Sequence, residues 1–490
     1  MKHNRRQFLG DLAGIAGLTM LPGTLKAAAN AATKPNIVLF LIDDMGWGDL
    51  GCYGNTFNET PNIDRLAQDG VRFTNAYAGA PVCSPSRTAI LTGKAPARVH
   101  LTQWIPGTIY PHKKLIEAPT PLHLDSNIPT LAELLKSAGY QTAAIGKWHL
   151  GGEGYLPENF GFDVNIAGDD HGHPPSYFGP FSFHNLSGYS KDDYLTDVLT
   201  DRMEAHICEV APKGPFFLYM AEYSVHMPLE AKLAMIEKYK RKNGGKDEPD
   251  PVYAAMIESA DTALGRLRAA LERAGVADNT IILLTSDNGG VGFQGRSLHR
   301  ISGNGGLHGG KGYLYEGGIR EPMLVHWPGV TRPGSLCTTP VIGMDFLPTL
   351  ARAAGASTIP LPCDGMDISG LLRGENTLQR ETLYWHYPHY SDQGGTPSGA
   401  IREGDWKLIE FFEDDHIELY NLALDPGEQY DFASNFAPKA EDLRAKLHQW
   451  RRSVDAVMPQ HNPDSNPRLA ELRQGPAGCS WLPSAACRED

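Results

Sequence analysis

The chain has 490 residues, of which 41% are hydrophobic and 21% are charged, a balance that excludes a disordered chain. Its 44 Lys and Arg residues against 57 Asp and Glu residues leave a net charge of −13, which argues against general binding of nucleic acid, since that needs a basic face. The length suits one large α/β domain with an attachment, or roughly two to four smaller domains.

Residues 1–32 have the pattern of an export signal. Arg5 and Arg6 precede a weakly apolar stretch, residues 8–21, that is shorter than the about 20 residues a membrane-spanning helix needs. Small residues follow at positions 27–32, where a signal peptidase could cut. The pattern resembles a twin-arginine signal, so we expect export by the twin-arginine machinery to a periplasmic or secreted location. The alternative is a chance Arg-Arg pair ahead of an uncleaved anchor.

Residues 33–375 alternate between apolar runs, which predict buried strands, and apolar side chains at helical spacing, which predict amphipathic helices. The predicted strands are residues 36–42, 142–145, 216–221, 281–284 and 323–327, and the predicted helices cover residues 131–138 and 257–271. This alternation favours an α/β fold in which a large, mostly parallel sheet is sandwiched by helices.

The pattern changes near residue 375. Residues 376–455 contain four strand candidates without intervening helices, followed by one amphipathic helix. The strand candidates are residues 382–387, 399–402, 406–412 and 418–422, and the helix carries Leu443, Leu447, Trp450 and Val454 on one stripe. We therefore expect a small α+β subdomain with an antiparallel sheet, and then a Pro/Gly-rich tail, residues 456–490, that wraps the surface.

The seven cysteines fit an exported protein. Because their number is odd, one is left over, and Cys83 is set aside for the reason given below. Cys479 with Cys487 and Cys337 with Cys363 are possible disulfide pairs. Buried free thiols are the competing interpretation.

Polar residues follow four of the predicted strands, at the edge where open parallel sheets bind their ligands. These residues are Asp43 and Asp44, then Lys147 and His149, then His226, and finally Asp287 and Asn288. An Asp pair after one strand is more often a turn or a helix cap, but four such sets favour a shared site. Three carboxylates and an amide make an all-oxygen site suited to Ca²⁺ or Mg²⁺, not to thiolate-bound zinc.

The sharpest motif is CSPSRTAILTG at residues 83–93. Ser84 followed by Pro85 predicts a helix start, and Gly93 predicts its end. Cys83 would then lie at a helix N-terminus, where backbone N–H groups favour an anion. From the residues alone, Cys83 is either an activated thiolate nucleophile or a buried cysteine at the end of a loop.

Several segments together resemble the formylglycine-dependent sulfatases of the alkaline-phosphatase superfamily. The first is the motif at 83–93, and the second is GYQTAAIGKWH at residues 139–149. Residues 309–322, around Lys311, resemble the family's sulfate-lysine segment, and residues 405–428 resemble its C-terminal subdomain. The resemblance covers about residues 35 to 455 and implies an alkaline-phosphatase-like fold and a sulfatase from a bacterial exported, carbohydrate-acting group.

The resemblance implies that a formylglycine-generating or sulfatase-maturing enzyme oxidises Cys83 to formylglycine, which is then hydrated to a gem-diol. One hydroxyl of the diol can attack sulfur, and deprotonation of the other then expels sulfate, an exit that a serine would lack. The resemblance favours Ca²⁺ over Mg²⁺, held by Asp43, Asp44, Asp287, Asn288 and residue 83.

The resemblance also assigns roles to the charged residues. Arg87 would orient the diol, and Lys147 and Lys311 would hold sulfate oxygens. His149 would take the proton when the diol breaks down. His226, together with Lys311, would protonate the leaving alcohol.

Two further histidines are weaker candidates for substrate binding. His308 lies near Lys311 in the sequence, where it would line the sulfate pocket or contact the residues that line it. His171 lies in a polar segment, residues 169–173, and such segments are more often plain surface loops than substrate-binding loops. The leading function is hydrolysis of sulfate esters on a carbohydrate. The alternatives are a phosphate mono- or diesterase of the same superfamily and a non-catalytic glycan-binding relative.

Overall fold

The computed structural model describes residues 34–244, 249–292, 301–356, 358–375 and 378–473. The predicted export signal, residues 1–32, and the cysteines at positions 479 and 487 therefore lie outside the described residues. Among the described helices, none is long and apolar enough to cross a membrane.

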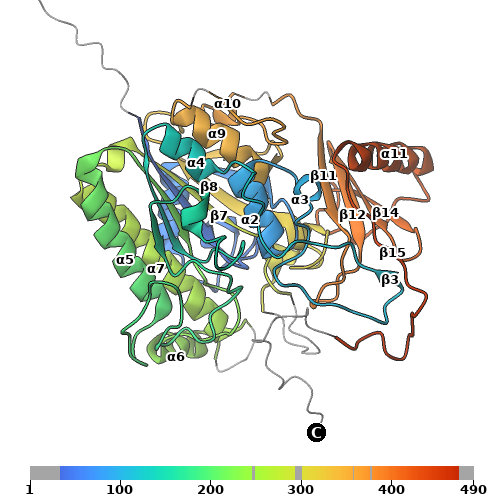
Figure 1. Ribbon diagram of the computed structural model, residues 1–490, viewed down its shortest axis with the longest axis horizontal. Helices are drawn as coiled ribbons and strands as arrows, with labels where there is room; N and C mark the ends of the chain where they lie inside the picture. The colour runs from blue at the N-terminus through green and yellow to red at the C-terminus, as the bar shows by residue number, and fades with distance from the viewer. Residues whose placement is uncertain (1–33, 245–248, 293–300, 357, 376–377, 474–490) are drawn as a thin grey trace, which may run out of the picture. The chain divides into compact units, whose positions relative to one another are not determined.

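A nine-stranded sheet forms the centre of the larger part of the chain (Figure 1). Its strands are β1 (Asn36–Ile42), β2 (Val71–Tyr77), β4 (Gln141–Gly146), β5 (Val164–Ile166), β6 (Phe216–Ala221), β7 (Thr280–Ser286), β8 (Arg320–His326), β9 (Ser335–Cys337) and β10 (Val341–Ile342). They run in the order β10-β2-β8-β7-β1-β6-β4-β5, with β9 also paired to β2. Only β8 is antiparallel to its neighbours, β2 and β7, within the described sheet. The expected mostly parallel sheet is confirmed.

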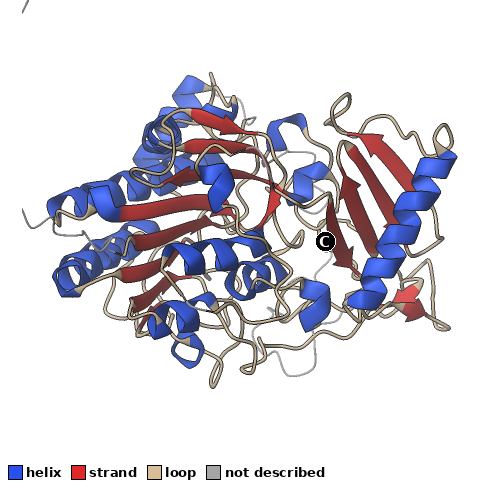
Figure 2. Cartoon of the chain, turned by 90° about the horizontal axis from the view of Figure 1, so that it is seen from above, coloured by secondary structure: helices blue, strands red, loops and turns tan. Residues whose placement is uncertain are grey.

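Helices cover both faces of this sheet, as Figure 2 shows. They are α1 (Pro61–Asp69), α2 (Cys83–Thr92), α3 (Pro96–Val99), α4 (Leu131–Ser137), α5 (Leu195–Val210), α6 (Leu233–Lys242), α7 (Pro251–Arg273), α8 (Glu316–Ile319), α9 (Phe346–Ala353) and α10 (Ser369–Leu372). Alternate residues of β1 point to opposite faces, so that Val38 and Phe40 pack against α5 and α7 while Ile37 and Leu39 face α2, α4 and α9. A strand buried on both faces needs a continuous apolar run, which is what β1 has.

A second, four-stranded antiparallel sheet follows in the order β11-β12-β13-β14. Its elements are β11 (Thr382–Tyr387), β12 (Ser398–Glu403), β13 (Trp406–Phe411), β14 (Ile417–Asn421) and the helix α11 (Ala437–Ser453). Ile401 and Leu408 pack against Leu443 of α11 on one face, while Ile409 on the other face packs against Ile319 of the larger part. The expected antiparallel sheet with one helix is confirmed.

The segment after α11 crosses back to the larger part of the chain. Its short strand β15 (Gln460–His461) pairs antiparallel with β3 (Leu115–Ile116). Asn462 strengthens this contact, because its side-chain amide donates to the carbonyl oxygens of Pro111 and Lys113 at 3.0 and 2.8 Å. The described part of the tail therefore lies against the surface near residues 111–116.

The predicted start of α2 is confirmed to within one residue. The cap of the helix is Val82, and the Oγ of Ser84 accepts the N–H of Ile105 at 3.0 Å. The helix begins at Cys83, so Pro85 occupies the third position of the first turn, where its missing N–H costs no helical hydrogen bond. Gly93 ends the helix with a φ of 65°, as predicted.

The structure decides between the two interpretations of one cysteine pair. Cys337 and Cys363 are both free thiols, so the possible disulfide between them does not form and the free-thiol interpretation holds for both. Cys337 belongs to β9, whereas the Sγ of Cys363 lies 3.5 Å from the carbonyl oxygen of Gly93 at the end of α2. Sequence spacing alone could not place these two residues relative to each other.

Candidate active site

The polar residues predicted at the strand ends come together in the structure. Asp43 and Asp44 follow β1, Lys147 and His149 follow β4, His226 follows β6, and Asp287 and Asn288 follow β7. The strands β7, β1, β6 and β4 are neighbours in this order, so their carboxyl ends present these side chains at one edge of the sheet. Lys311 reaches the same edge from the loop before α8.

Each of the three carboxylates has a cationic partner. Asp43 lies 2.6 Å from Lys147, Asp44 lies 2.8 Å from Lys311, and Asp287 lies 2.8 Å from Arg87. All six side chains are buried, so each charge needs its partner. Arg87 also donates from Nη1 to the carbonyl oxygen of Lys147 at 2.8 Å, which ties α2 to the end of β4.

Two oxygen atoms of this cluster lack a hydrogen-bond partner. Both Oδ1 of Asp43 and Oδ1 of Asn288 are buried and unsatisfied within the part of the chain described. Burial first of all, and then the Asp287 carboxylate, raise the pKa of Asp43 well above its usual value. Burial also acts to raise the pKa of Asp44, but Lys311 and His226 outweigh it and lower that pKa. The unsatisfied oxygens and the buried negative charge fit a hard cation, which favours carboxylate and amide oxygens.

The side-chain amide of Asn288 is oriented by its neighbours. Its Nδ2 donates to Oδ1 of Asp44 at 2.7 Å and to the carbonyl oxygen of Gly289 at 3.0 Å, which leaves Oδ1 as the free acceptor. The backbone N–H of Asp44 donates to Oδ1 of Asp287 at 3.2 Å. These hydrogen bonds hold the oxygen-bearing side chains at the ends of β1 and β7 in one group.

Cys83 is the first residue of α2 and is fully buried beside this group. Burial raises the pKa of its thiol, although Lys147 and Lys311 act in the opposite direction. The effect of burial at this thiol favours the buried-cysteine interpretation over the activated thiolate. Arg87 follows four residues later in the same helix, one turn away.

The two histidines each have one ring nitrogen committed to a backbone carbonyl. Nε2 of His149 makes a short contact with the carbonyl oxygen of Ile105, so it must carry the proton, and Nδ1 is buried without a partner among the described residues. Nδ1 of His226 lies 2.9 Å from the carbonyl oxygen of Met227, which leaves the Nε2 lone pair for Lys311 at 3.0 Å. Burial, followed by the charge of a neighbouring lysine, lowers the pKa of both imidazoles.

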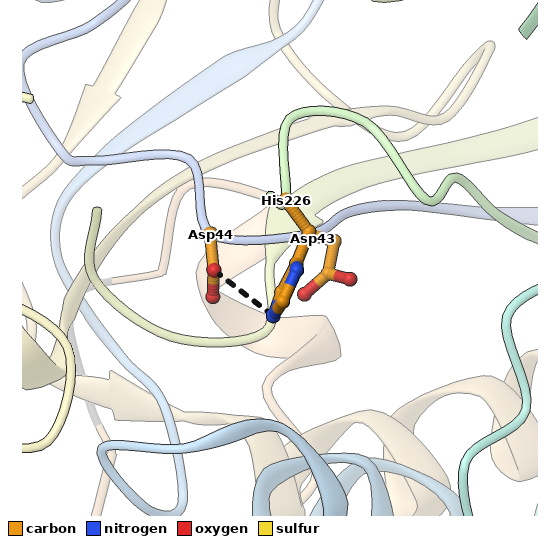
Figure 3. A group of neighbouring side chains, drawn as sticks. All are labelled: Asp43, Asp44 and His226. Atoms are coloured by element: carbon orange, nitrogen blue, oxygen red, sulfur yellow. Dashed lines mark ion pairs between the residues drawn. The ribbon is translucent and has the colours of Figure 1, made fainter. Parts of the chain in front are cut away.

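Figure 3 shows the ring of His226 reaching toward the carboxylates at the end of β1. Its Nε2 lies 3.5 Å from Oδ2 of Asp44, the atom that also accepts from Lys311. Asp44, Lys311 and His226 thus form a connected triad at the edge of the carboxylate group, in which Lys311 contacts both of the other side chains.

A cavity of about 240 Å³ opens onto these residues. It is lined by Cys83, His149, His226 and Lys311 of the predicted site, and by Trp104, Gly172, His173, Asp392 and Gln393. Of the two weaker candidates, neither lines it. His308 is exposed and stacks on Tyr315 with ring centroids 3.9 Å apart, and His171 is half-buried and bonds Asp169 at 2.8 Å.

Sequence reasoning had given no role to Trp104, Asp392 or Gln393. His173 belongs to the polar segment 169–173 that was noted, and its ring stacks on His226 with centroids 5.7 Å apart. Asp392 and Gln393 lie in the loop between β11 and β12, in the smaller sheet. No local pattern could connect that loop with Cys83, because more than 300 residues separate them and only packing of the two sheets brings them together.

A mixed, mostly parallel sheet between helical layers, with an antiparallel sheet at its C-terminal side, is the alkaline-phosphatase-like fold. The chain belongs to the sulfatase family, whose sequence profile matches residues 35–356, and it is a sulfuric ester hydrolase. A second profile, described as N-sulphoglucosamine sulphohydrolase, C-terminal, matches residues 304–454. The family resemblance seen in the motifs is thus confirmed.

Individual relatives agree with the profiles. Human arylsulfatase A is 33% identical, over 87% of this chain and 88% of its own length. A sulfatase of Formosa agariphila is 32% identical, over 86% of this chain and 89% of its own. Among solved structures, that of Ps i-CgsB in complex with k-i-k-neocarrahexaose superposes with a TM-score of 0.73 at 29% identity, and covers 88% of this chain and 95% of that chain.

Proposed function

We propose that this sulfatase removes sulfate from carbohydrates by means of a formylglycine residue made from Cys83 and a divalent cation. The observation that carries the proposal is that Cys83 lines the same cavity as Lys311, His149 and His226. Burial raises the pKa of the Cys83 thiol, which weakens the thiol as a nucleophile and supports a nucleophile of another kind at this position. Formylglycine supplies it, as a hydrated aldehyde with one hydroxyl to attack sulfur and a second to release the sulfate.

The cation is assigned to the oxygens of Asp43, Asp44, Asp287 and Asn288. The support is that Oδ1 of Asp43 and Oδ1 of Asn288 are buried without a hydrogen-bond partner in the described structure, and that hydrogen bonds join Asn288 to Asp44 and Asp44 to Asp287. Such a donor set suits Ca²⁺ or Mg²⁺, and the family resemblance favours Ca²⁺. A hard cation there would offset negative charge on residue 83 and on the sulfate group.

The chain's own cations support binding of the sulfate. Lys311 is 6% exposed and lines the cavity, while Lys147 is fully buried against Asp43. Because both ammonium groups are buried, their attraction for an anion is stronger than it would be in water. Arg87 is fixed by Asp287 and by the Lys147 carbonyl, and it would hold the side chain of residue 83 one helical turn away.

His149 is suited to take a proton from residue 83. Its Nε2–H is committed to the Ile105 carbonyl, so Nδ1 carries the lone pair, and this atom is buried and free to accept. The lowered pKa keeps the ring neutral at neutral pH, which a proton acceptor requires.

Protonation of the leaving alcohol is assigned to the Lys311 and His226 pair. Lys311 donates toward Nε2 of His226 at 3.0 Å. The lowered pKa of His226 keeps the shared proton on Lys311, from which the pair would protonate an oxygen in the cavity. A sugar alkoxide is a poor leaving group, so this step matters for a carbohydrate substrate.

The carbohydrate substrate rests on the relatives and on the sequence pattern. Ps i-CgsB is solved with a carrahexaose, and the C-terminal profile is named for an N-sulphoglucosamine sulphohydrolase. A twin-arginine-like signal at residues 1–32 supports export to the periplasm or secretion, where the enzyme would encounter polymeric sulfated sugars. A maturing enzyme for Cys83 would act before export, since the twin-arginine route carries folded proteins.

The experiment that tests this function compares ester classes on one preparation of the enzyme. Release of inorganic sulfate from sugar and aryl sulfates, measured by ion chromatography, should exceed release of phosphate from matched mono- and diesters. Faster hydrolysis of a phosphate ester would favour the phosphoesterase alternative. Binding of sulfated glycans without any hydrolysis by protein that contains formylglycine would favour the non-catalytic alternative.

A further inference from the structure

Part of the cavity is lined by residues that have no role in the proposed reaction at sulfur. Asp392 and Gln393 line this part, and they come from the β11–β12 loop, residues 388–397, of the smaller sheet. Trp104 lines the cavity beside them from the loop after α3. A sulfate ester bound at Lys311 must place its alcohol part in the same cavity, so these three side chains, together with His173, are candidates to contact it.

The β11–β12 loop is held in a fixed position by the larger part of the chain. Nε2 of His389 lies 2.8 Å from Oγ1 of Thr102, and Gln103 donates to the carbonyl oxygen of Tyr390 at 3.2 Å. On its other side, Tyr313 donates to the carbonyl oxygen of Gln393 at 3.0 Å. A loop anchored at both sides presents its side chains in a preorganised position, which lowers the entropic cost of binding a ligand.

Asp392 has acceptor capacity to spare. Tyr110 donates to Oδ1 at 2.6 Å, and Thr108 donates to Oδ2 at 3.2 Å. A carboxylate has about four acceptor positions, so about two remain, one on each oxygen. The side chain is 26% exposed, and therefore reachable by a ligand. Two acceptors on one carboxylate match two adjacent hydroxyl groups of a sugar ring.

Gln393 and Trp104 add a hydrogen-bond donor and an aromatic surface to the lining of the cavity. The Oε1 of Gln393 accepts from Ser391 at 2.8 Å, so its amide nitrogen is left to donate to an oxygen in the cavity. Trp104 is half-buried and offers an aromatic surface of the kind on which the apolar face of a sugar can pack. Acceptors, a donor and an aromatic surface in one wall are what a polyhydroxylated ring requires.

The charge of Asp392 adds a restriction. A carboxylate accepts hydrogen bonds only, so it attracts hydroxyl groups and repels another anion. Arg473 lies 3.6 Å from Oδ1, but it is 49% exposed, so solvent weakens its effect on the cavity. A ligand with a carboxylate or a second sulfate against this wall would meet an unfavourable charge.

We propose that Asp392, Gln393 and Trp104 form the leaving-group subsite, and that it binds a neutral sugar through two adjacent hydroxyl groups while selecting against uronates and polysulfated sugars. This inference rests on the proposed sulfatase function and names its substrate class. Asp392 and Gln393 are specificity-determining residues, and they take no part in the reaction at sulfur.

The test compares the wild type with Asp392→Asn on enzyme that contains formylglycine. The probes are 4-nitrophenyl sulfate and a panel of monosulfated hexoses and N-acetylhexosamines, each with a disulfated and a uronate-containing counterpart. The matched control is Asp405→Asn, which removes the same charge from an exposed position between β12 and β13. Thermal unfolding of each variant checks that the fold is intact.

We expect neutral monosulfated sugars to be the best sugar substrates of the wild type. Asp392→Asn should lower the ratio of kcat/KM for the best sugar to that for 4-nitrophenyl sulfate about 10- to 100-fold, the usual effect of losing hydrogen bonds to a charged group. Asp392→Asn should also lower the ratio of kcat/KM for neutral sugars to that for anionic sugars. Asp405→Asn should change neither this ratio nor the ratio of sugar to aryl sulfate.

Two results would overturn the subsite and leave the proposed function intact. They are a preference of the wild type for uronates or disulfated sugars, and equal losses of activity on sugar and aryl substrates in Asp392→Asn. Hydrolysis of the aryl sulfate but of no sugar would reject both the subsite and the carbohydrate substrate. Failure of the enzyme to hydrolyse any sulfate ester would instead reject the proposed function and the subsite together.

Discussion

Nε2 of His226 lies 3.0 Å from Nζ of Lys311, and Nδ1 of the same ring is turned toward the Met227 carbonyl oxygen. The lone pair of Nε2 therefore faces a lysine that is itself paired with Asp44. This relationship supports the proposed joint role of the histidine and the lysine in protonating the leaving group.

The first prediction follows from this pair. His226→Ala should slow hydrolysis of a sugar sulfate about 10²–10⁴-fold, because general-acid catalysis is worth that much where the leaving group needs a proton. An aryl oxide with electron-withdrawing groups leaves without a proton, so the variant should slow hydrolysis of an aryl sulfate much less. The measurement is kcat/KM together with single-turnover rates for both substrate types. Equal losses on both would reject the acid role and leave only a positioning role.

The second prediction concerns His149. His149→Ala should slow sugar and aryl sulfates to the same extent, because the proton it takes comes from residue 83 and not from the leaving group. With 4-nitrophenyl sulfate in a stopped-flow instrument, we expect one equivalent of nitrophenol to appear quickly while sulfate is released slowly. Loss of the initial nitrophenol release as well would place His149 in the first step of the reaction.

The carboxylate group leads to the third prediction. Asn288→Ala removes one oxygen without leaving a buried cation unpaired, whereas removal of the Asp287 carboxylate would strand Arg87, and breaking a buried pair costs about 3–5 kcal/mol. Asn288→Ala should therefore lower the content of bound Ca²⁺ or Mg²⁺ in elemental analysis while the protein stays folded. EDTA should lower the Tm of the wild type, and added Ca²⁺ should restore it, since a ligand that binds only the folded state stabilises it.

A matched substitution of an exposed amide, Asn127→Ala, should change neither the metal content nor the effect of EDTA. Stoichiometric zinc in the wild type would contradict the assignment. So would a Tm that EDTA leaves unchanged.

The fourth prediction is a dependence of stability on pH. Glu222 is fully buried at the end of β6, and neither of its carboxylate oxygens has a hydrogen-bond partner in the described structure. Burial, and then the charge of Asp197, raise its pKa to about 8. A carboxyl whose pKa is higher in the folded state than in the unfolded state binds more protons when folded, so it favours folding at low pH. That advantage is lost as the pH rises through the folded pKa.

Between about pH 4.5 and 8, the free energy of unfolding should therefore fall by up to about 1.4 kcal/mol per pH unit through this one group. Denaturant unfolding of the wild type, Glu222→Gln and an exposed control, Glu153→Gln, would measure this slope. We expect Glu222→Gln to reduce the slope and to stabilise the protein at pH 8, and the control to keep it. An unchanged slope in Glu222→Gln would show that Glu222 keeps its charge on folding.

The sequence predicted the sheet edge well because the signals there are local. A short apolar run such as residues 36–42 favours a strand buried on both faces, and the polar residues that follow such a strand lie at its end. The positions of Asp43, Asp44, Asp287 and Asn288 follow from strand direction alone. Lys311 lies in an irregular loop, and only the family resemblance pointed to it.

The features that sequence reasoning missed depend on tertiary contacts. The hydroxyl of Ser84 accepts the backbone N–H of Ile105 and is not used as a helix cap. Nothing in the apolar sequence of β8 indicates that this strand runs antiparallel to its neighbour. Asp392 reaches the cavity because Thr108 and Tyr110 hold it there, across a distance of about 280 residues in the chain. Interactions of this range have no periodic pattern that a single sequence could reveal.

The central claim is that residue 83 acts as formylglycine, and the most direct measurement is peptide mass spectrometry of residue 83 combined with sulfate release by the same sample. Enzyme from a host that carries a maturing enzyme should contain a residue that has lost one sulfur and two hydrogen atoms and gained one oxygen. Across preparations with different degrees of conversion, sulfate release should rise in proportion to the converted fraction. Full activity in a sample that contains only unmodified Cys83 would contradict the account.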